Sequence, residues 1–344
     1  MKVLAVVVLG AVALLGAGLF ALTRYLDSEA FRRAAISAAQ GALGAPVAVG
    51  RMDVSLFSGA TLRQVTVGNP PGVPGEFLRA EALVVRPRLL PLLRRRLEIA
   101  EIRLDAPNVT LHRNERGEWS FERLAVRPPP ATAPGGSAPG ADTPMLPPVP
   151  ASFDVIVPNL VLSRGTLDVA RERKGPLLRA EGIEVSTSWS RVGGALSGAG
   201  ELTIASLRIA DRVDVRSLTA PLQFGGGDLK ITPLRGQLAD GTLGGNVTVR
   251  FAAPARYAID LDLRDARAEA LLAAIGGRNL SGRLQAQARI AGTGEGPTGQ
   301  GHAEIRDGRL LDFPVLGAVA AALDLPLLRE LRFEEGAIDF VLAG

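Results

Sequence analysis

The chain of 344 residues contains no cysteine. This absence excludes disulfides, thiolate metal ligands and a cysteine nucleophile, and it is compatible with an oxidising compartment. Aromatic residues are only 4% of the chain, and no run interleaves them with arginine. The stacking platforms that single-stranded DNA or RNA binding needs are therefore missing, and we expect no nucleic-acid partner.

Lysine is also scarce, occurring only at Lys2, Lys174 and Lys230. The 39 lysines and arginines nearly balance 35 aspartates and glutamates, which leaves a net charge of +4. The calculated pI near 10.0 therefore reflects arginine in place of lysine rather than a strong excess of positive charge. Abundant Ala, Gly and Arg are typical of a GC-rich genome, so an arginine cluster is weak evidence of selection for charge.

The chain offers few groups from which an active site could be assembled. His112 and His302 are the only histidines, and both fall at polar-facing positions of strand-like segments. Asp260 and Asp262 lie on the wet face of an alternating strand, which favours solvated carboxylates over a metal site. GTGEGPTG, residues 292–299, has proline at the third glycine of a dinucleotide motif and no Walker lysine, so a hairpin turn is expected. We expect no catalytic, metal or cofactor site, and no enzymatic activity.

The N-terminus carries the strongest single signal. Residues 3–22 are uncharged and would span about 30 Å as a helix, the hydrocarbon thickness of a bilayer. The length of this run and the lack of a clear A-x-A site favour a transmembrane anchor over residues 1–25 rather than a cleaved signal peptide. Flanking charges do not decide its orientation. Residues 27–43 then predict a short amphipathic helix ending before Gly44 and Pro46.

After Pro46 the dominant hydrophobic period is two, in segments separated by Gly, Pro, Asn or Asp turns. This pattern predicts a mainly β protein of roughly fifteen short antiparallel strands, each with one apolar face, and few short helices. Besides the alternating segments 183–189, 247–251, 259–264 and 284–290, strands are expected near 60–67, 79–86, 97–104, 108–113, 153–161, 166–171, 201–209, 213–223, 302–310 and 333–342.

Two segments interrupt this pattern. Residues 127–152 are dense in Pro, Ala, Gly and Ser and predict a poorly ordered linker. It would separate a helix and strand unit at 26–126 from a larger β region at 153–344. Residues 310–328 are largely apolar but are interrupted by Pro314, Asp324 and Pro326. They are too broken for a second membrane span, and we expect a helix covering one end of the sheet.

The order of these elements resembles the AsmA family. An anchor, a short helix and a strand series lead to a leucine-rich connection, then to strands of the types I-x-x-I-x-L-x-x-P and L-x-R and a G-x-x-W turn. The matching residues are Ile99, Ile102, Leu104, Pro107, Leu111, Arg113, Gly117 and Trp119, although Glu118 stands where the family often carries Asn. Residues 280–323 are similar to the C-terminal AsmA-like region. That region would normally continue with further strands, so residues 153–344 are expected to be truncated or unusually short.

The resemblance implies an elongated, curved, groove-like sheet behind the anchor. It implies an inner-membrane, single-pass protein with its bulk in the periplasm of a Gram-negative envelope, acting in outer-membrane biogenesis. The implied partner is membrane phospholipid, with envelope proteins as further partners. An alternative is a non-enzymatic assembly or structural factor for outer-membrane proteins that carries no lipid.

Two sets of residues follow as candidates for lipid contact. The apolar sides of the alternating strands would line a groove, although the same residues also fit an ordinary packed core. The arginines of RPRLLPLLRRRL, residues 86–97, would contact anionic headgroups or form a merely solvated turn. The groove candidates are Ile183, Val185, Val247, Val249, Phe251, Ile259, Leu261, Leu263, Leu284 and Ile290, and the headgroup candidates are Arg94, Arg95 and Arg96.

Overall fold

The computed structural model describes residues 28–55, 58–69, 73, 75–88, 91, 96–114, 119–120, 154–171, 175–192, 195–251, 256–275, 280–293, 296–311 and 330–342. The predicted anchor, the linker at 127–152 and nearly all of the 310–328 segment lie outside these residues. Among the described helices, none has the length and apolar character required to cross a membrane.

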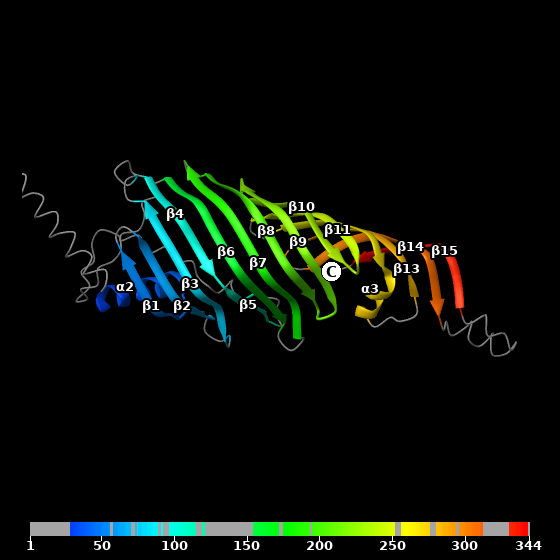
Figure 1. Ribbon diagram of the computed structural model, residues 1–344, viewed down its shortest axis with the longest axis horizontal. Coiled ribbons are helices and arrows are strands. Elements are labelled where there is room, and N and C mark those ends of the chain that lie inside the picture. The colour runs from blue at the N-terminus through cyan, green and yellow to red at the C-terminus, as the bar shows by residue number, and fades with distance from the viewer. Residues whose placement is uncertain are drawn as a thin grey trace, which may run out of the picture.

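The described strands form one 15-stranded sheet, and they lie side by side along the long axis of the molecule (Figure 1). The path across the sheet follows chain order from β1 to β15, except that β5 lies off it and pairs with β3 and β6. The strands are β1 (Val47–Ser55), β2 (Gly59–Gly68), β3 (Glu76–Arg88), β4 (Arg96–Asp105), β5 (Asn108–Arg113), β6 (Asp154–Arg171), β7 (Gly175–Val192), β8 (Ala195–Ile209), β9 (Val213–Gly225), β10 (Asp228–Leu238), β11 (Gly241–Arg250), β12 (Arg256–Arg267), β13 (Leu280–Thr293), β14 (Gly296–Leu311) and β15 (Glu330–Leu342). The mainly β prediction is confirmed.

Nearly all strand pairs are antiparallel, as expected, but β6 runs parallel to both β4 and β5. This parallel seam joins the strands that precede residues 127–152 to those that follow them. The Ala106 N–H donates to the Ser163 carbonyl over 2.8 Å, and the Thr166 N–H donates to the Pro107 carbonyl over 2.7 Å. The two predicted β regions therefore share one continuous sheet.

Several long strands contain a bulge at a residue with positive φ. Arg164 in β6, Ser217 in β9, Asp265 in β12 and Asp307 in β14 have φ between 50° and 55°. Pairing registers shift at Arg164 and Asp265, where β6 and β12 meet their neighbours. A bulge bends its strand and increases the local twist, so a series of them curves the sheet.

Helix α2 (Glu29–Leu43) confirms the predicted amphipathic helix. The Ser28 hydroxyl accepts a hydrogen bond from the Phe31 N–H at the N-cap. Gly44 ends the helix in the left-handed conformation, with φ 62°, and its N–H donates to the Gln40 carbonyl. The apolar side of α2 packs on β1 and β2, forming a small core with buried members Ala45, Val47, Val49 and Val67.

Helix α3 (Ala268–Ile275), between β12 and β13, shows how strongly the sheet curves. It contacts both β13 and β9, which are four strands apart. On a flat sheet these strands would be about 19 Å apart, wider than the roughly 10 Å of a helix. Leu271 packs on a core cluster that includes Leu218, Leu234 and Leu263. The apolar face is therefore the inner face of the curl.

Candidate functional site

The structure brings most groove candidates together on the inner apolar face. Val247 of β11 lies opposite Ile259 of β12, and Ile259 lies opposite Ile290 of β13. One row away, Leu261 pairs with Ala288. These rows lie perpendicular to the strands, so side chains of the same face form a continuous apolar surface from strand to strand.

The candidates in β7 extend the same kind of surface toward the N-terminal part of the sheet. Ile183 lies opposite Ile204 of β8, and Val185 lies opposite Leu202. Ile204 also packs against the core cluster that contains Leu263. The predicted residues of β7 and of β11–β13 thus belong to one face, although about 60 residues separate them in the chain.

This face is packed in one part and open in another. Leu263 is buried with Leu243 and Val215 beside α3, as in an ordinary core. Most other groove candidates are half-buried, and Phe251 is 58% exposed. The two interpretations of the apolar residues therefore apply to different parts of the same surface.

The surface stays open at the last described strand. Ile338, Phe340 and Leu342 of β15 continue the apolar face opposite Ala303, Gly301 and Gly299 of β14. All three are exposed, Ile338 by 62%. A Cβ atom on Gly301 would lie 2.2 Å from the Phe340 ring, so only glycine leaves room for that ring on the neighbouring strand.

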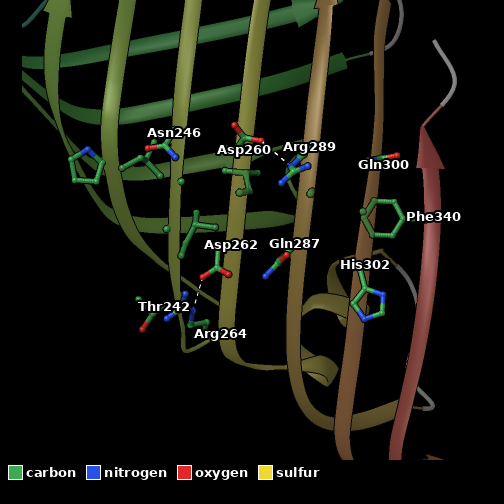
Figure 2. Close-up of a pocket in the computed structure, with 18 of the residues that line it drawn as sticks. Thr242, Asn246, Asp260, Asp262, Arg264, Gln287, Arg289, Gln300, His302 and Phe340 are labelled. Atoms are coloured by element: carbon green, nitrogen blue, oxygen red, sulfur yellow. Dashed lines mark hydrogen bonds and ion pairs between the residues drawn. The ribbon is translucent and has the colours of Figure 1, made fainter.

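A cavity of about 1230 Å³ follows β10 to β15 (Figure 2). This is larger than the roughly 300–1,000 Å³ typical of small-molecule pockets. Leu261 is the one groove candidate in its lining, which also includes Leu234, Leu243 and Phe340 from the apolar face. Polar residues of the opposite face line it as well, namely Asp260, Asp262, Arg264, Arg289, His302 and Asp339. The cavity is therefore a mixed polar and apolar depression, and the lipid hypothesis depends on the apolar face rather than on this cavity.

On the opposite face of these strands, charged side chains form ion pairs within one strand and between adjacent strands. The Asp262 carboxylate lies 2.6 Å from Nε of Arg264, and Asp260 lies 3.5 Å from Nε of Arg289 (Figure 2). His302 Nδ1 lies 2.7 Å from a carboxylate oxygen of Asp339. The two aspartates therefore meet arginines on an exposed face, as the alternation indicates.

Glu304 of β14 and Glu335 of β15 are joined by a side-chain hydrogen bond that depends on their protonation. A hydrogen bond between their side chains raises the pKa of Glu335 above its ordinary value, and the charge of Glu304 adds to the shift. The same bond, with a second one from Arg306, lowers the pKa of Glu304. Glu335 is exposed, whereas the Glu304 side chain is only 20% exposed, and the contact between them links β14 to β15.

The described residues hold no group of three or more His, Asp or Glu side chains placed to bind a metal ion. The described residues of the 292–299 segment belong to antiparallel β13 and β14, with Thr293 paired to Gly296 as in a hairpin. Gly226 and Gly227, both at positive φ, likewise form the turn between β9 and β10.

The arginine-rich stretch joins β3 to β4, as predicted. Arg86 Nη1 donates to Glu101 over 2.6 Å, and Arg88 pairs with Glu98, so two of its cations are matched by β4 carboxylates. Arg96 begins β4, but its side chain, like all of Arg94 and Arg95, lies outside the described residues.

Sequence reasoning missed one feature of this face, a row of aromatic rings at one end of the strands. Trp189 of β7 stacks on Phe224 of β9, with ring centroids 5.2 Å apart. Phe224 in turn lies 6.0 Å from Phe251, which follows β11. Each ring lies near the end of an alternating strand, but only the strand register brings the three together.

The comparisons with known proteins agree with the order of elements. The model of the AsmA family matches residues 1–189, which is more than half of the chain. Searches of curated proteins and of solved structures gave no match. The chain belongs to the AsmA family.

Proposed function

We propose that this protein is a periplasmic member of the AsmA family, held in the inner membrane by one N-terminal helix, that acts in outer-membrane biogenesis by holding or transferring phospholipid acyl chains. AsmA membership supports an envelope role. The inner apolar face, which runs across β7 to β15 and is still exposed at β15, carries the lipid part of the proposal.

An acyl chain can bind along the unfilled apolar face of the curved sheet. Exposed Ile338 and Phe340 leave apolar area in contact with water, which costs about 25 cal/mol per Å². An acyl chain along the face would cover that area without needing backbone hydrogen bonds, since the strands already pair with each other. Extended chains also match the long axis of the sheet.

The test is phospholipid recovered with the purified full chain, measured by native mass spectrometry and lipid extraction in mild detergent. We expect Leu261→Asp and Phe340→Asp to lower the lipid recovered per protein several-fold, because each places a carboxylate on the apolar face. Phe340 is already exposed, so its replacement leaves the core intact. Thr248→Asp, on the opposite face of β11, is the matched control. The absence of lipid above a mock purification would overturn the lipid role.

The alternative is an assembly factor for outer-membrane proteins without lipid cargo. The packed region around Leu263 and α3 favours it, because that part of the face is already filled by protein. It predicts crosslinks to envelope proteins that survive Leu261→Asp. Under either function we propose a non-enzymatic protein whose headgroup contacts include Arg94, Arg95 and Arg96.

A further inference from the structure

Large apolar side chains are exposed mainly at one end of the strands. We define the aromatic rim as the end formed by the β7–β8, β9–β10 and β11–β12 connections, and the α3 rim as the opposite end. Val192, Leu196 and Phe251 lie at the aromatic rim, as do Val341 and Leu342 at the end of β15. Of the nine exposed large hydrophobic residues in the described chain, these five share one rim.

The ring stack gives this rim a continuous apolar surface. Trp189 and Phe224 both lie opposite Gly198 of β8, so no side chain on β8 separates their rings. The rings meet at an interplanar angle of 25°, and Phe251 adds a third ring tilted by 51°. Phe251 is anchored by its N–H, which donates to the Gly227 carbonyl over 2.9 Å.

The charged side chains near these strand ends are mostly positive, although Lys230, Arg250 and Arg256 lie on the face opposite the rings. Arg191, Lys230, Arg250 and Arg256 lie within a few residues of these strand ends and are exposed. Among the described side chains at these connections, Asp228 is the one acid. Arg250 donates two hydrogen bonds to its carboxylate, of 2.8 and 2.9 Å. At the strand ends, where both faces of the sheet meet solvent, the described residues of these connections therefore carry more cations than acids.

The strands that flank the arginine-rich stretch reach the same rim through strand pairing. Arg96 lies beside Asp154 at the start of β6, and Val155 of β6 lies opposite Arg191 at the end of β7. Figure 1 shows the end of β3, the start of β4 and the end of β7 along the same upper margin of the sheet. Strand ends that are far apart in sequence thus lie on the same rim.

We propose that the aromatic rim is a docking surface for the headgroup region of an anionic membrane. Tryptophan, phenylalanine and exposed aliphatic groups lower their free energy at a membrane interface, and arginine and lysine are attracted to anionic lipids there. The α3 rim contrasts with it, since Leu271 of α3 packs inward on the core. Docking at this rim does not require lipid cargo in the groove, so this inference and the proposed function can fail separately.

The two tryptophans of the chain supply an internal comparison. Trp189 lies at the aromatic rim, whereas Trp119 bridges to Arg113, whose neighbour Arg171 ends β6 at the α3 rim. Trp119→Phe and Trp189→Phe each leave a single tryptophan, while any N-terminal anchoring is common to both variants. The full chain is reconstituted into vesicles of phosphatidylcholine and phosphatidylglycerol with brominated acyl chains. We expect quenching of Trp189 to exceed that of Trp119 by at least about twofold.

Charge reversal tests the anionic part of the proposal. Arg191→Glu with Arg256→Glu is expected to reduce Trp189 quenching to the level of Trp119, and so are vesicles of phosphatidylcholine alone. Arg212→Glu, in the β8–β9 turn at the α3 rim, is the matched control and should change nothing. Equal quenching of the two tryptophans, or quenching independent of phosphatidylglycerol, would overturn the docking.

Spin-label accessibility provides a second measurement that does not depend on the folding of the tryptophan variants. Because the chain lacks cysteine, single cysteines at Val192 and Ile209 can carry spin labels at exposed sites of the two rims. We expect the label at 192 to gain oxygen accessibility in anionic vesicles and the label at 209 to remain aqueous. Crosslinking of the 192 site to an envelope protein, without lipid contact, would assign the rim to a protein and overturn the proposal.

Discussion

The two edges of the sheet are treated in opposite ways. Along β1, side chains of α2 occupy the outer backbone carbonyls: Arg32 Nη2 donates to Val49 O over 2.7 Å, and Gln40 Nε2 donates to Val47 O over 3.0 Å. The helix also buries Val47 and Val49. Along β15, no described element lies beyond the strand, and its apolar side chains are exposed.

This difference matters because an unprotected edge strand can pair with another chain. The family match covers the capped edge and ends within β7, whereas the open edge lies beyond it. The capped edge thus limits where the sheet can add strands, and the open edge leaves both a backbone and an apolar surface available. The difference between the capped β1 edge and the open β15 edge can be tested at each strand.

The largest expected effect comes from removing the same side chain at each edge. Val49 on β1 is 8% exposed, and Val341 on β15 is 83% exposed. Val49→Ala should destabilise β1 by about 2 kcal/mol, from about 0.8 kcal/mol per buried methylene and the cavity left behind. Val341→Ala should cost less than about 0.5 kcal/mol. Hydrogen exchange of β1 and β15 peptides measures both, and equal effects would contradict the contrast.

A smaller effect is expected from uncapping β1 while leaving its core intact. Arg32→Ala with Gln40→Ala removes the donors to the carbonyls of Val47, Val49 and Gly50. Arg32 Nη2 makes two of the three bonds, and Arg32 and Gln40 are at least partly exposed, so water replaces much of what is lost and we expect a total of about 1 kcal/mol. We expect faster exchange in β1 and β2, and concentration-dependent association in light scattering through the exposed edge. Arg33→Ala, on the solvent side of α2, is the control, and a monomeric double variant would show that the caps do not protect the edge.

The alternation of apolar residues was sufficient to predict β11 to β13 and their shared face. It failed where bulges or turn-forming residues break the parity. β10 was missed because Pro233 and Gly236 interrupt its pattern. Strands expected at 153–161 and 166–171 are one strand, because Arg164 at positive φ forms a bulge there rather than a turn.

The site was predictable in kind but not in its boundaries. Alternation identified Leu261 and Leu263 alike, yet only α3 determines that Leu263 is packed while the face opens toward β15. The aromatic rim required register, since Trp189 and Phe224 meet over Gly198 from strands two places apart. The parallel pairing of β4 with β6 depends on contacts across residues 127–152, and no local pattern encodes it.

The smallest expected effect concerns the pH dependence of the open edge. The raised pKa of Glu335 means that its bond to Glu304 contributes stability below the ordinary value of 4.5 and loses it as pH rises through the raised pKa. Glu304, with its lowered pKa, contributes in the opposite direction, losing stability as pH falls through that lower pKa. The pair should therefore hold β15 on β14 best in mildly acidic solution, between the two pKa values, where one proton is shared.

Glu335→Gln keeps a donor to Glu304 at every pH and should abolish the loss of protection near neutrality. Hydrogen exchange of β15, corrected for intrinsic rates and compared between mildly acidic and neutral buffer, measures the effect. Glu334→Gln is the control on the same strand, and it should keep the pH dependence of the original chain. Because the pair lies between β14 and β15, at the opposite edge of the sheet from β1, the change is expected in β15 alone and not in β1. A matching change in β1 would mean that the two edges respond as one unit, and their contrast would then be one of burial rather than of local stability.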